Sequence, residues 1–177
     1  MEEQGVKFGT LMHTVMQHLP IRYYNENYLK LALYGLKEEG LITKAEAKVI
    51  PVQRLLQFFK SDLGARMLAA YETDPSRVER ELSFSLLLEG KTLDVELEEG
   101  EEVFLQGVMD LVFEEDGQWV LVDYKTDAVP EGEDAARFLK ERYQIQLDVY
   151  AKALEKITNK KIKQKFIYSF TYGQIAL

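Results

Sequence analysis

The hydrophobic period of this chain changes at Asp74-Pro75, and that change constrains the fold more than any other feature. Before it, apolar residues such as Leu11, Val15 and Leu19 recur every four positions, which is the spacing of one helix face. After it, apolar residues fall into short alternating runs that are typical of strands. A chain that passes from helices to strands in this way is expected to pack helical layers on a sheet.

Turn and cap residues divide the chain into elements. Pro20 and Gly40 end helical runs, and Thr43 with Glu46 forms the pattern of a capping box. Asp116-Gly117 is a hairpin turn between two strands. Helices are predicted over residues 8–19, 25–39, a short segment after Thr43, 52–59, 61–71 and 134–157, and strands over 78–88, 92–97, 102–113, 119–126 and 165–170.

This order predicts an α/β fold with a mixed β-sheet flanked by helices. No internal repeat, low-complexity segment or linker interrupts the 177 residues. We therefore expect one domain over residues 1–177, with a helical N-terminal part at 1–75 and a catalytic part of sheet and helices at 76–177.

Composition excludes several classes of protein. The chain has no cysteine, which excludes disulfides, cysteine-based zinc sites and iron–sulfur clusters. No apolar run approaches the roughly 20 residues that cross a bilayer, and no secretory signal follows Met1. With 46% apolar residues the chain can bury a core. Since it shows neither a signal nor a spanning segment, we expect a soluble protein of the cytoplasm.

The charge is unevenly distributed. The formal net charge of −8 argues against a free-standing nucleic-acid binder, because phosphate contacts need lysine and arginine. Residues 137–165, however, contain nine Lys/Arg and three Asp/Glu. This basic stretch indicates either an anionic partner or a solvated helix face followed by a lysine-rich turn.

Asp123 and Lys125 lie at the end of the apolar run Val120–Val122. Side chains two apart in a strand share a face, so these two charges are expected to point the same way. A charge beside a core-forming run is costly unless it is paired or binds an ion. A simple Asp–Lys pair at a strand end is the ordinary alternative to a functional site.

Asp110 lies in the middle of another apolar run, with the same parity as Val108 and Val112. The Asp116-Gly117 hairpin would bring its strand beside that of Asp123, so the two carboxylates could converge. Converging carboxylates repel, and a divalent cation relieves the repulsion. Gly107, which has no side chain, permits the close approach of another group.

Three further residues are candidates beside this pair of acids. His13, on the first predicted helix, could supply an imidazole ligand, although a lone histidine is more often packed or solvated. Gln146 and Tyr150 are four residues apart and share a helix face. The ordinary explanation of Tyr150 is core packing, since Leu147 and Leu154 lie on the same apolar stripe.

Two acids and a lysine on adjacent strands suit phosphodiester hydrolysis. Mg²⁺ prefers carboxylate ligands, keeps waters and binds phosphate oxygens. It can also lower the pKa of a water and stabilise developing charge. Lys125 lies among carboxylates and should stay protonated, so an orienting and electrostatic role is favoured over that of a free-amine base.

Four motifs together resemble the RecB-type branch of the PD-(D/E)XK nucleases. They are Gly9-x-x-x-His13, Gly107-Val-Met-Asp110, Asp123-Tyr-Lys125-Thr and Gln146-x-x-x-Tyr150, in that order. Each motif alone is weak, but their order and spacing are specific and extend over most of the chain. The stretches 9–19 and 143–154 look most like the nuclease domain of AddA-type chains of bacterial helicase–nucleases.

The resemblance implies a restriction-endonuclease-like fold and assigns roles to residues of this chain. Lys125 would be catalytic together with the acids, and Gln146 and Tyr150 would help form the site and position the DNA strand. A glutamate on an earlier strand can also face the site, and Glu81 is the corresponding position. The implied ligands of Mg²⁺, for which Mn²⁺ can substitute, are His13, Asp110, Asp123 and the carbonyl of Tyr124.

The resemblance also implies a biological setting. The expected activity is exonuclease-type hydrolysis of single-stranded DNA in double-strand-break repair and recombination, in the bacterial cytoplasm at the nucleoid. The expected partners are DNA, a helicase portion of the same polypeptide and an AddB-type subunit. Nuclease domains of the AddB type carry a four-cysteine iron–sulfur cluster, which this chain cannot hold, so the AddA type is favoured.

Two other functions remain open from the sequence. The domain could be a catalytically silent scaffold or DNA-guiding domain of a helicase–nuclease complex, although silent relatives should lose an acid or the lysine. It could also be a metal-dependent enzyme that acts on another phosphodiester or on a nucleotide.

Overall fold

The strands form one mixed sheet in the order β1-β2-β3-β4-β5. The computed structural model describes residues 2–89 and 102–177, so the strand predicted over 92–97 lies outside the described residues. β3 and β4 run parallel and are connected by helix α6 (Ala135–Thr158), whereas the other neighbours are antiparallel. The strands are β1 (Val78–Glu89), β2 (Glu102–Glu115), β3 (Gln118–Lys125), β4 (Ile162–Ser169) and β5 (Gly173–Ala176).

Five helices precede the sheet, followed by a 3₁₀ turn at Pro75–Arg77. Their starts follow from local capping: Thr43 and Glu46 form the predicted capping box, and the Ser61 hydroxyl accepts a hydrogen bond from the Gly64 N–H. The helices are α1 (Glu2–His18), α2 (Glu26–Glu38), α3 (Lys44–Val49), α4 (Val52–Lys60) and α5 (Asp62–Thr73).

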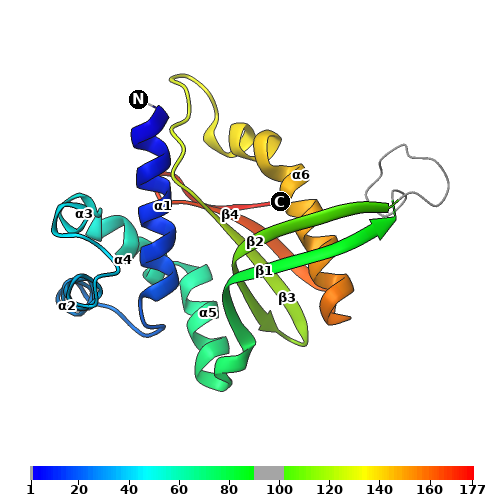
Figure 1. Cartoon of the computed structure of the whole chain (residues 1–177), viewed down its shortest axis with the longest axis horizontal. Helices are drawn as coiled ribbons and strands as arrows, with labels where there is room; N and C mark the ends of the chain where they lie inside the picture. Colours follow the sequence, from blue (N-terminus) through cyan, green and yellow to red (C-terminus); the bar gives the residue numbers. More distant parts are fainter. Residues whose placement is uncertain (1, 90–101) are drawn as a thin grey trace.

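The sheet separates two hydrophobic clusters. Helices α1 to α5 gather on one side of the sheet and α6 lies on the other (Figure 1). Strand β3 contributes to both clusters by alternation: Val120 and Val122 face α1 to α5, and Trp119 and Leu121 face α6. The same alternation places Asp123 and Lys125 on the α6 side.

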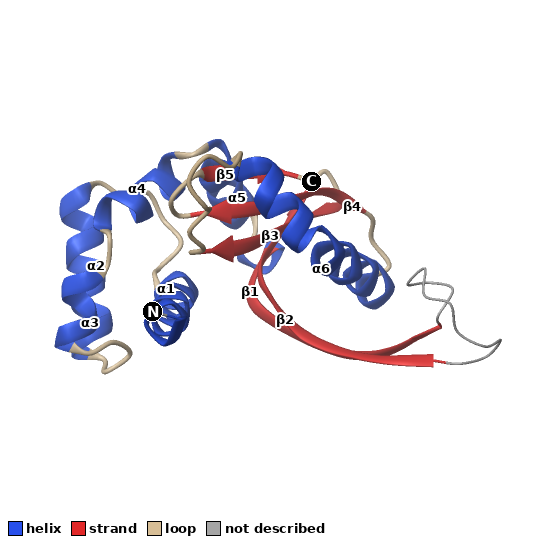
Figure 2. Cartoon of the chain, turned by 90° about the horizontal axis from the view of Figure 1, so that it is seen from above, coloured by secondary structure: helices blue, strands red, loops and turns tan. Residues whose placement is uncertain are grey.

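The alternation reverses at one point of the β1–β2 pair. Arg80 faces α1, where its guanidinium donates to the carbonyl oxygens of Met16 and Leu19, whereas Leu82 packs in the α6-side cluster. Between them Glu81 has a φ of 53°, in the left-handed region that is uncommon for a residue with a side chain. Beyond this point the β1–β2 pair extends away from the rest of the sheet (Figure 2).

The reversal corrects one expectation from the sequence. Strict alternation predicted that the side chains of Val108, Asp110 and Val112 lie on one face of the sheet. Val112, however, is fully buried and Val108 is 40% exposed. In β2, Leu111 faces α1 to α5 and Met109 faces α6. The expectation was wrong because the alternation of side chains between the two faces of the sheet reverses at Asp110.

The remaining predicted elements are confirmed with shifts of at most three residues, except that α1 begins at Glu2, six residues earlier than predicted. The Asp116-Gly117 turn has φ values of 53° and 74°, as a two-residue hairpin with two left-handed positions requires. β4 begins at Ile162, three residues earlier than predicted. The four-residue edge strand β5 was not predicted, because so short a run carries no periodic signal.

The lysines that follow α6 are largely compensated by acids of the β2–β3 hairpin. Lys160 pairs with Glu114 at 2.5 Å, and Lys163 pairs with Glu115 at 2.5 Å and Asp116 at 2.6 Å. These pairs favour the solvated-face interpretation of the basic stretch over that of an anion-binding surface. Within the described residues, no helix is both long and apolar enough to span a membrane.

We predict that Glu115→Gln lowers stability in a pH-dependent way. Hydrogen bonds from Arg66, with Lys163 nearby, lower the pKa of Glu115 from 4.5 to about 2. The ionised form therefore stabilises the fold above pH 4.5, and this contribution is lost as the pH falls towards 2. With allowance for solvent screening, urea denaturation at pH 7 should show a loss of about 1 kcal/mol that shrinks below pH 4.5.

Glu131→Gln, in the exposed loop before α6, is the control and should change the free energy of unfolding little at either pH. A Glu115→Gln effect that is as large at pH 2.5 as at pH 7 would contradict the assignment.

Candidate active site

Two acids occupy the positions where β2 and β3 stop pairing. The antiparallel ladder ends at Leu111 and Val122, and the next residues on the two strands are Asp110 and Asp123. These residues are only 7% and 3% exposed, whereas most acids of the described chain are at least partly exposed. The predicted convergence of the two strands is therefore present, and both carboxylates need compensation at this point.

Asp110 belongs to a cluster of three potential ligands. Asp110 Oδ1 lies 3.2 Å from His13 Nδ1, and Glu81 Oε1 lies 3.7 Å from the same nitrogen. One donor atom from each of these residues falls within 4.8 Å of the others. The left-handed conformation of Glu81 thus coincides with its place in the cluster.

Helix α1 is fixed at both ends of the segment that carries His13. Arg80 holds the carbonyls of Met16 and Leu19 near its C-terminal end. At Gly9 a Cβ atom would lie 3.3 Å from the Thr126 hydroxyl, so glycine lets the helix approach the residue that follows Lys125. These contacts give a physical reason for the Gly9-x-x-x-His13 spacing.

Asp123 is compensated by Lys125, as strand parity predicted. Lys125 Nζ lies 2.6 Å from Asp123 Oδ2, and both side chains are largely buried. Burial raises the pKa of Asp123 from 3.8 to about 6, with Asp110 adding to the shift and Lys125 opposing it. The lysine therefore offsets only part of the cost of ionising this carboxylate.

The cluster fits a divalent cation. Burial lowers the pKa of His13, but hydrogen bonds to Asp110 and Glu81 outweigh it and raise the pKa to about 10. These acids therefore favour a positive charge at this position. An imidazole nitrogen and carboxylate oxygens are suitable ligands for such a cation. Asp123 lies beside the three-residue cluster rather than within it, because its carboxylate is turned to Lys125.

Tyr124 contributes through its backbone. Its N–H donates to Asp110 Oδ2 at 2.6 Å, which fixes the orientation of that carboxylate. Its side chain points to the opposite face and is buried in the core, where it contacts the rings of Phe58 and Phe170. The peptide of Tyr124 is thus at the site, and its carbonyl remains a predicted ligand.

Gln146 and Tyr150 form a hydrogen-bonded pair on α6. Gln146 Nε2 donates to the Tyr150 hydroxyl at 3.2 Å. A Cβ atom at Gly107 would lie 3.0 Å from that hydroxyl and from Phe84, so glycine allows Tyr150 to reach β2 three residues from Asp110. Tyr150 also stacks edge-on against Phe84. The packing interpretation of Tyr150 is therefore confirmed, and its role in positioning a DNA strand stays a prediction.

Lys125 contacts Tyr143, which the sequence pattern did not identify, and Tyr143 is in turn bound by Asp127. Its ammonium lies 4.2 Å from the ring centre of Tyr143 on α6. The Tyr143 hydroxyl donates to Asp127 Oδ1 at 2.7 Å. The acidic residue two positions after Lys125 is the only signal in the sequence, and it does not indicate a partner 16 residues away.

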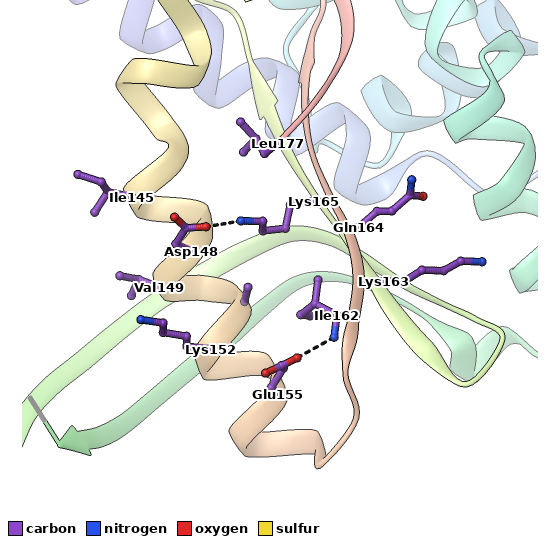
Figure 3. A pocket seen from close by; sticks show the side chains of 11 residues that line it. Ile145, Asp148, Val149, Lys152, Glu155, Ile162, Lys163, Gln164, Lys165 and Leu177 are labelled. Atoms are coloured by element: carbon purple, nitrogen blue, oxygen red, sulfur yellow. Dashed lines mark hydrogen bonds and ion pairs between the residues drawn. The ribbon is translucent and has the colours of Figure 1, made fainter. Parts of the chain in front are cut away.

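A groove of about 720 Å³ lies elsewhere, between α6 and β4 (Figure 3). Its lining includes Ile145, Ile162 and Leu177 together with two internally compensated pairs, Lys165 with Asp148 and Glu155 with the Ile162 N–H. None of the clustered acids lines it, so its size alone does not make it the active site.

Helices cover both faces of the mixed sheet, and two acids lie where β2 and β3 stop pairing. This arrangement fits an α/β nuclease domain. The family profile described as the PD-(D/E)XK nuclease superfamily matches residues 1–175, so the chain belongs to that family. This match confirms the resemblance drawn from the four motifs.

Relatives of known name share similarity over nearly the whole chain. Two of them, from Clostridium perfringens and Bacillus cereus, carry the name of the A-type chain of an ATP-dependent helicase/nuclease. They are 41% and 37% identical to this protein, each over 96% of its length, and it spans 14% of the length of each. A solved Vibrio cholerae protein aligns over 94% of the chain and 43% of its own length, at 12% identity. Its TM-score of 0.32 is too low to show a shared fold.

We predict that Asp123→Asn stabilises the metal-free protein. Because the pKa of Asp123 is raised to about 6, its ionisation costs folding free energy above that pH. Asparagine removes the charge but keeps an oxygen that can accept from Lys125. Urea denaturation at pH 8 in EDTA should show a gain of about 1–2 kcal/mol, which disappears as the pH falls from 6 towards 3.8.

Glu131→Gln again serves as the exposed control. A less stable Asp123→Asn protein at pH 8 would show that the Lys125 pair outweighs the cost of burial.

Proposed function

We propose that this domain is a Mg²⁺-dependent deoxyribonuclease that hydrolyses single-stranded DNA delivered by an attached helicase, in a complex with an AddB-type subunit. The observation that carries the proposal is the placement of Asp110, Asp123 and Lys125 where β2 and β3 stop pairing. Family membership and the names of the relatives support the nuclease class. Exonuclease-type cleavage in the repair and recombination of double-strand breaks, in the bacterial cytoplasm, is the setting we propose.

His13, Asp110 and Asp123 would hold the cation, together with the carbonyl of Tyr124. Glu81 is a further donor, since its carboxylate shares His13 Nδ1 with Asp110. A divalent cation would lower the pKa of a bound water and compensate negative charge at the phosphate. For Asp123 to join His13 and Asp110, its carboxylate would exchange part of its contact with Lys125 for the cation.

Lys125 would act as a charged donor rather than as a base. Its ammonium lies 2.6 Å from Asp123 Oδ2, so its charge is compensated by that carboxylate. Two of its three N–H groups remain for an attacking water or a phosphate oxygen, on which negative charge develops during hydrolysis. Because the side chain is only 15% exposed, this interaction is less screened than one at the surface.

Gln146 and Tyr150 would position the DNA strand. Tyr150 reaches the backbone of β2 at Gly107, and its hydroxyl also accepts from Gln146. A phosphate or sugar oxygen near Asp110 could take over part of this hydrogen bonding. Since the basic residues after α6 are paired with acids, little of the affinity for DNA would come from this domain.

We expect the isolated protein to cleave labelled single-stranded DNA with Mg²⁺ or Mn²⁺ and not with EDTA. Asp123→Ala should abolish turnover, since it removes a ligand and the partner of Lys125. Cleavage that survives EDTA, or that survives Asp123→Ala in a folded protein, would overturn the metal mechanism. Wild-type protein that binds the cation but cleaves neither DNA nor nucleotides would instead favour a silent scaffold.

Lys125→Met should lower kcat by about 10²- to 10³-fold, as the loss of one preorganised donor to the developing charge does. The matched control is Lys165→Met, because Lys165 is also a partly buried lysine of the sheet that is paired with an acid, Asp148. Its kcat should stay within about twofold of the wild type. Equal losses in the two variants would assign the effect to stability rather than to chemistry.

A further inference from the structure

The ammonium group of Lys125 is held from two sides. Asp123 Oδ2 lies 2.6 Å from Nζ, and the ring centre of Tyr143 lies 4.2 Å from it. The carboxylate belongs to β3 and the ring belongs to α6, so the two contacts come from different elements of the fold. A lysine has four rotatable side-chain bonds, and a second contact restricts where its charge can go.

The ring of Tyr143 is itself fixed. Its hydroxyl donates to Asp127 Oδ1 at 2.7 Å, and burial together with this bond raises the pKa of the phenol. Asp127 lies in the loop after β3, and that loop is tied to the end of the chain by the Val129 N–H, which donates to the Tyr172 hydroxyl. Tyr143 therefore joins α6 to the segment that carries Lys125.

Other charges near Tyr143 do not replace this contact. Arg142 also lies over the same ring, 5.6 Å from its centre, and its Nε is 3.9 Å from Asp127. Its side chain is 56% exposed, so its attraction to either group is weakened by solvent. Lys125, at 15% exposure, lies closer to the ring and is better shielded.

We propose that Tyr143, oriented by Asp127, is a positioning residue that aims the ammonium of Lys125 at the reacting phosphate. The ring and the Asp123 carboxylate both attract the ammonium, which restricts its position and still leaves an N–H for a phosphate oxygen. When the carboxylate of Asp123 engages a cation, the ring keeps the ammonium in place. The proposal rests on the proposed function, since it acts through Lys125.

Single-turnover and steady-state cleavage of single-stranded DNA with Mg²⁺ test the proposal. Tyr143→Leu removes the ring and should lower kcat by about 5- to 30-fold, the range expected for a partly desolvated cation–π contact. KM for DNA and the calorimetric Kd for Mn²⁺ should change less than twofold, because ligands and strand contacts remain. Tyr143→Phe keeps the ring, loses the bond to Asp127, and should fall between the wild type and Tyr143→Leu.

Asp127 offers a conservative rescue. Asp127→Asn keeps an oxygen that can accept from the Tyr143 hydroxyl and should retain most of the wild-type kcat, whereas Asp127→Ala should match Tyr143→Phe. Phe138→Leu is the matched control, since Phe138 is another partly buried aromatic residue of α6 that packs in the core. It should leave kcat unchanged even if it lowers the melting temperature.

Changing the charge distribution of the ring at position 143 while keeping its shape separates its electrostatic role from its packing role. Phenylalanine at position 143 can be compared with its progressively fluorinated analogues, whose ring faces attract cations less strongly. We expect kcat to fall stepwise with fluorination at unchanged melting temperature. A flat series, an unchanged kcat in Tyr143→Leu, or parallel changes in kcat, KM and metal Kd would overturn the proposal. An inactive wild-type protein would instead contradict the proposed function.

Discussion

The burial of two carboxylates at the end of the β2–β3 ladder is the constraint on which the site depends. Asp110 and Asp123 lie where the strands stop pairing, at low exposure. Buried charges of one sign are tolerated only with nearby compensation. His13 and the Tyr124 N–H compensate Asp110, and Lys125 compensates Asp123.

Each compensating group is held by a distinct element of the fold. Helix α1 carries His13 and is fixed by Arg80, while α6 supplies Tyr143 to Lys125. The reversal of side-chain order at Glu81 brings a third carboxylate to the same place. The fold therefore stores negative charge in a small volume at a cost in stability, as functional sites commonly do.

Much of this could be predicted from the sequence, because strand parity and hairpin geometry are local rules. They placed Asp123 with Lys125 and brought Asp110 alongside. The left-handed Glu81 could not be predicted, since nothing in its residue type favours that conformation, and the expected parity at Val108 was therefore wrong. The Tyr143–Asp127 bond joins a helix to a loop, and such contacts have no period in the sequence.

Anomalous diffraction from crystals soaked in Mn²⁺ tests the central claim most directly, because it identifies the ligands of each ion. We expect a peak between His13, Asp110 and Asp123, with Glu81 at its edge, and no peak there in Asp110→Asn crystals. A wild-type crystal with no peak among these side chains would contradict the proposed metal site. An equal peak in crystals of the Asp110→Asn variant would contradict it as well.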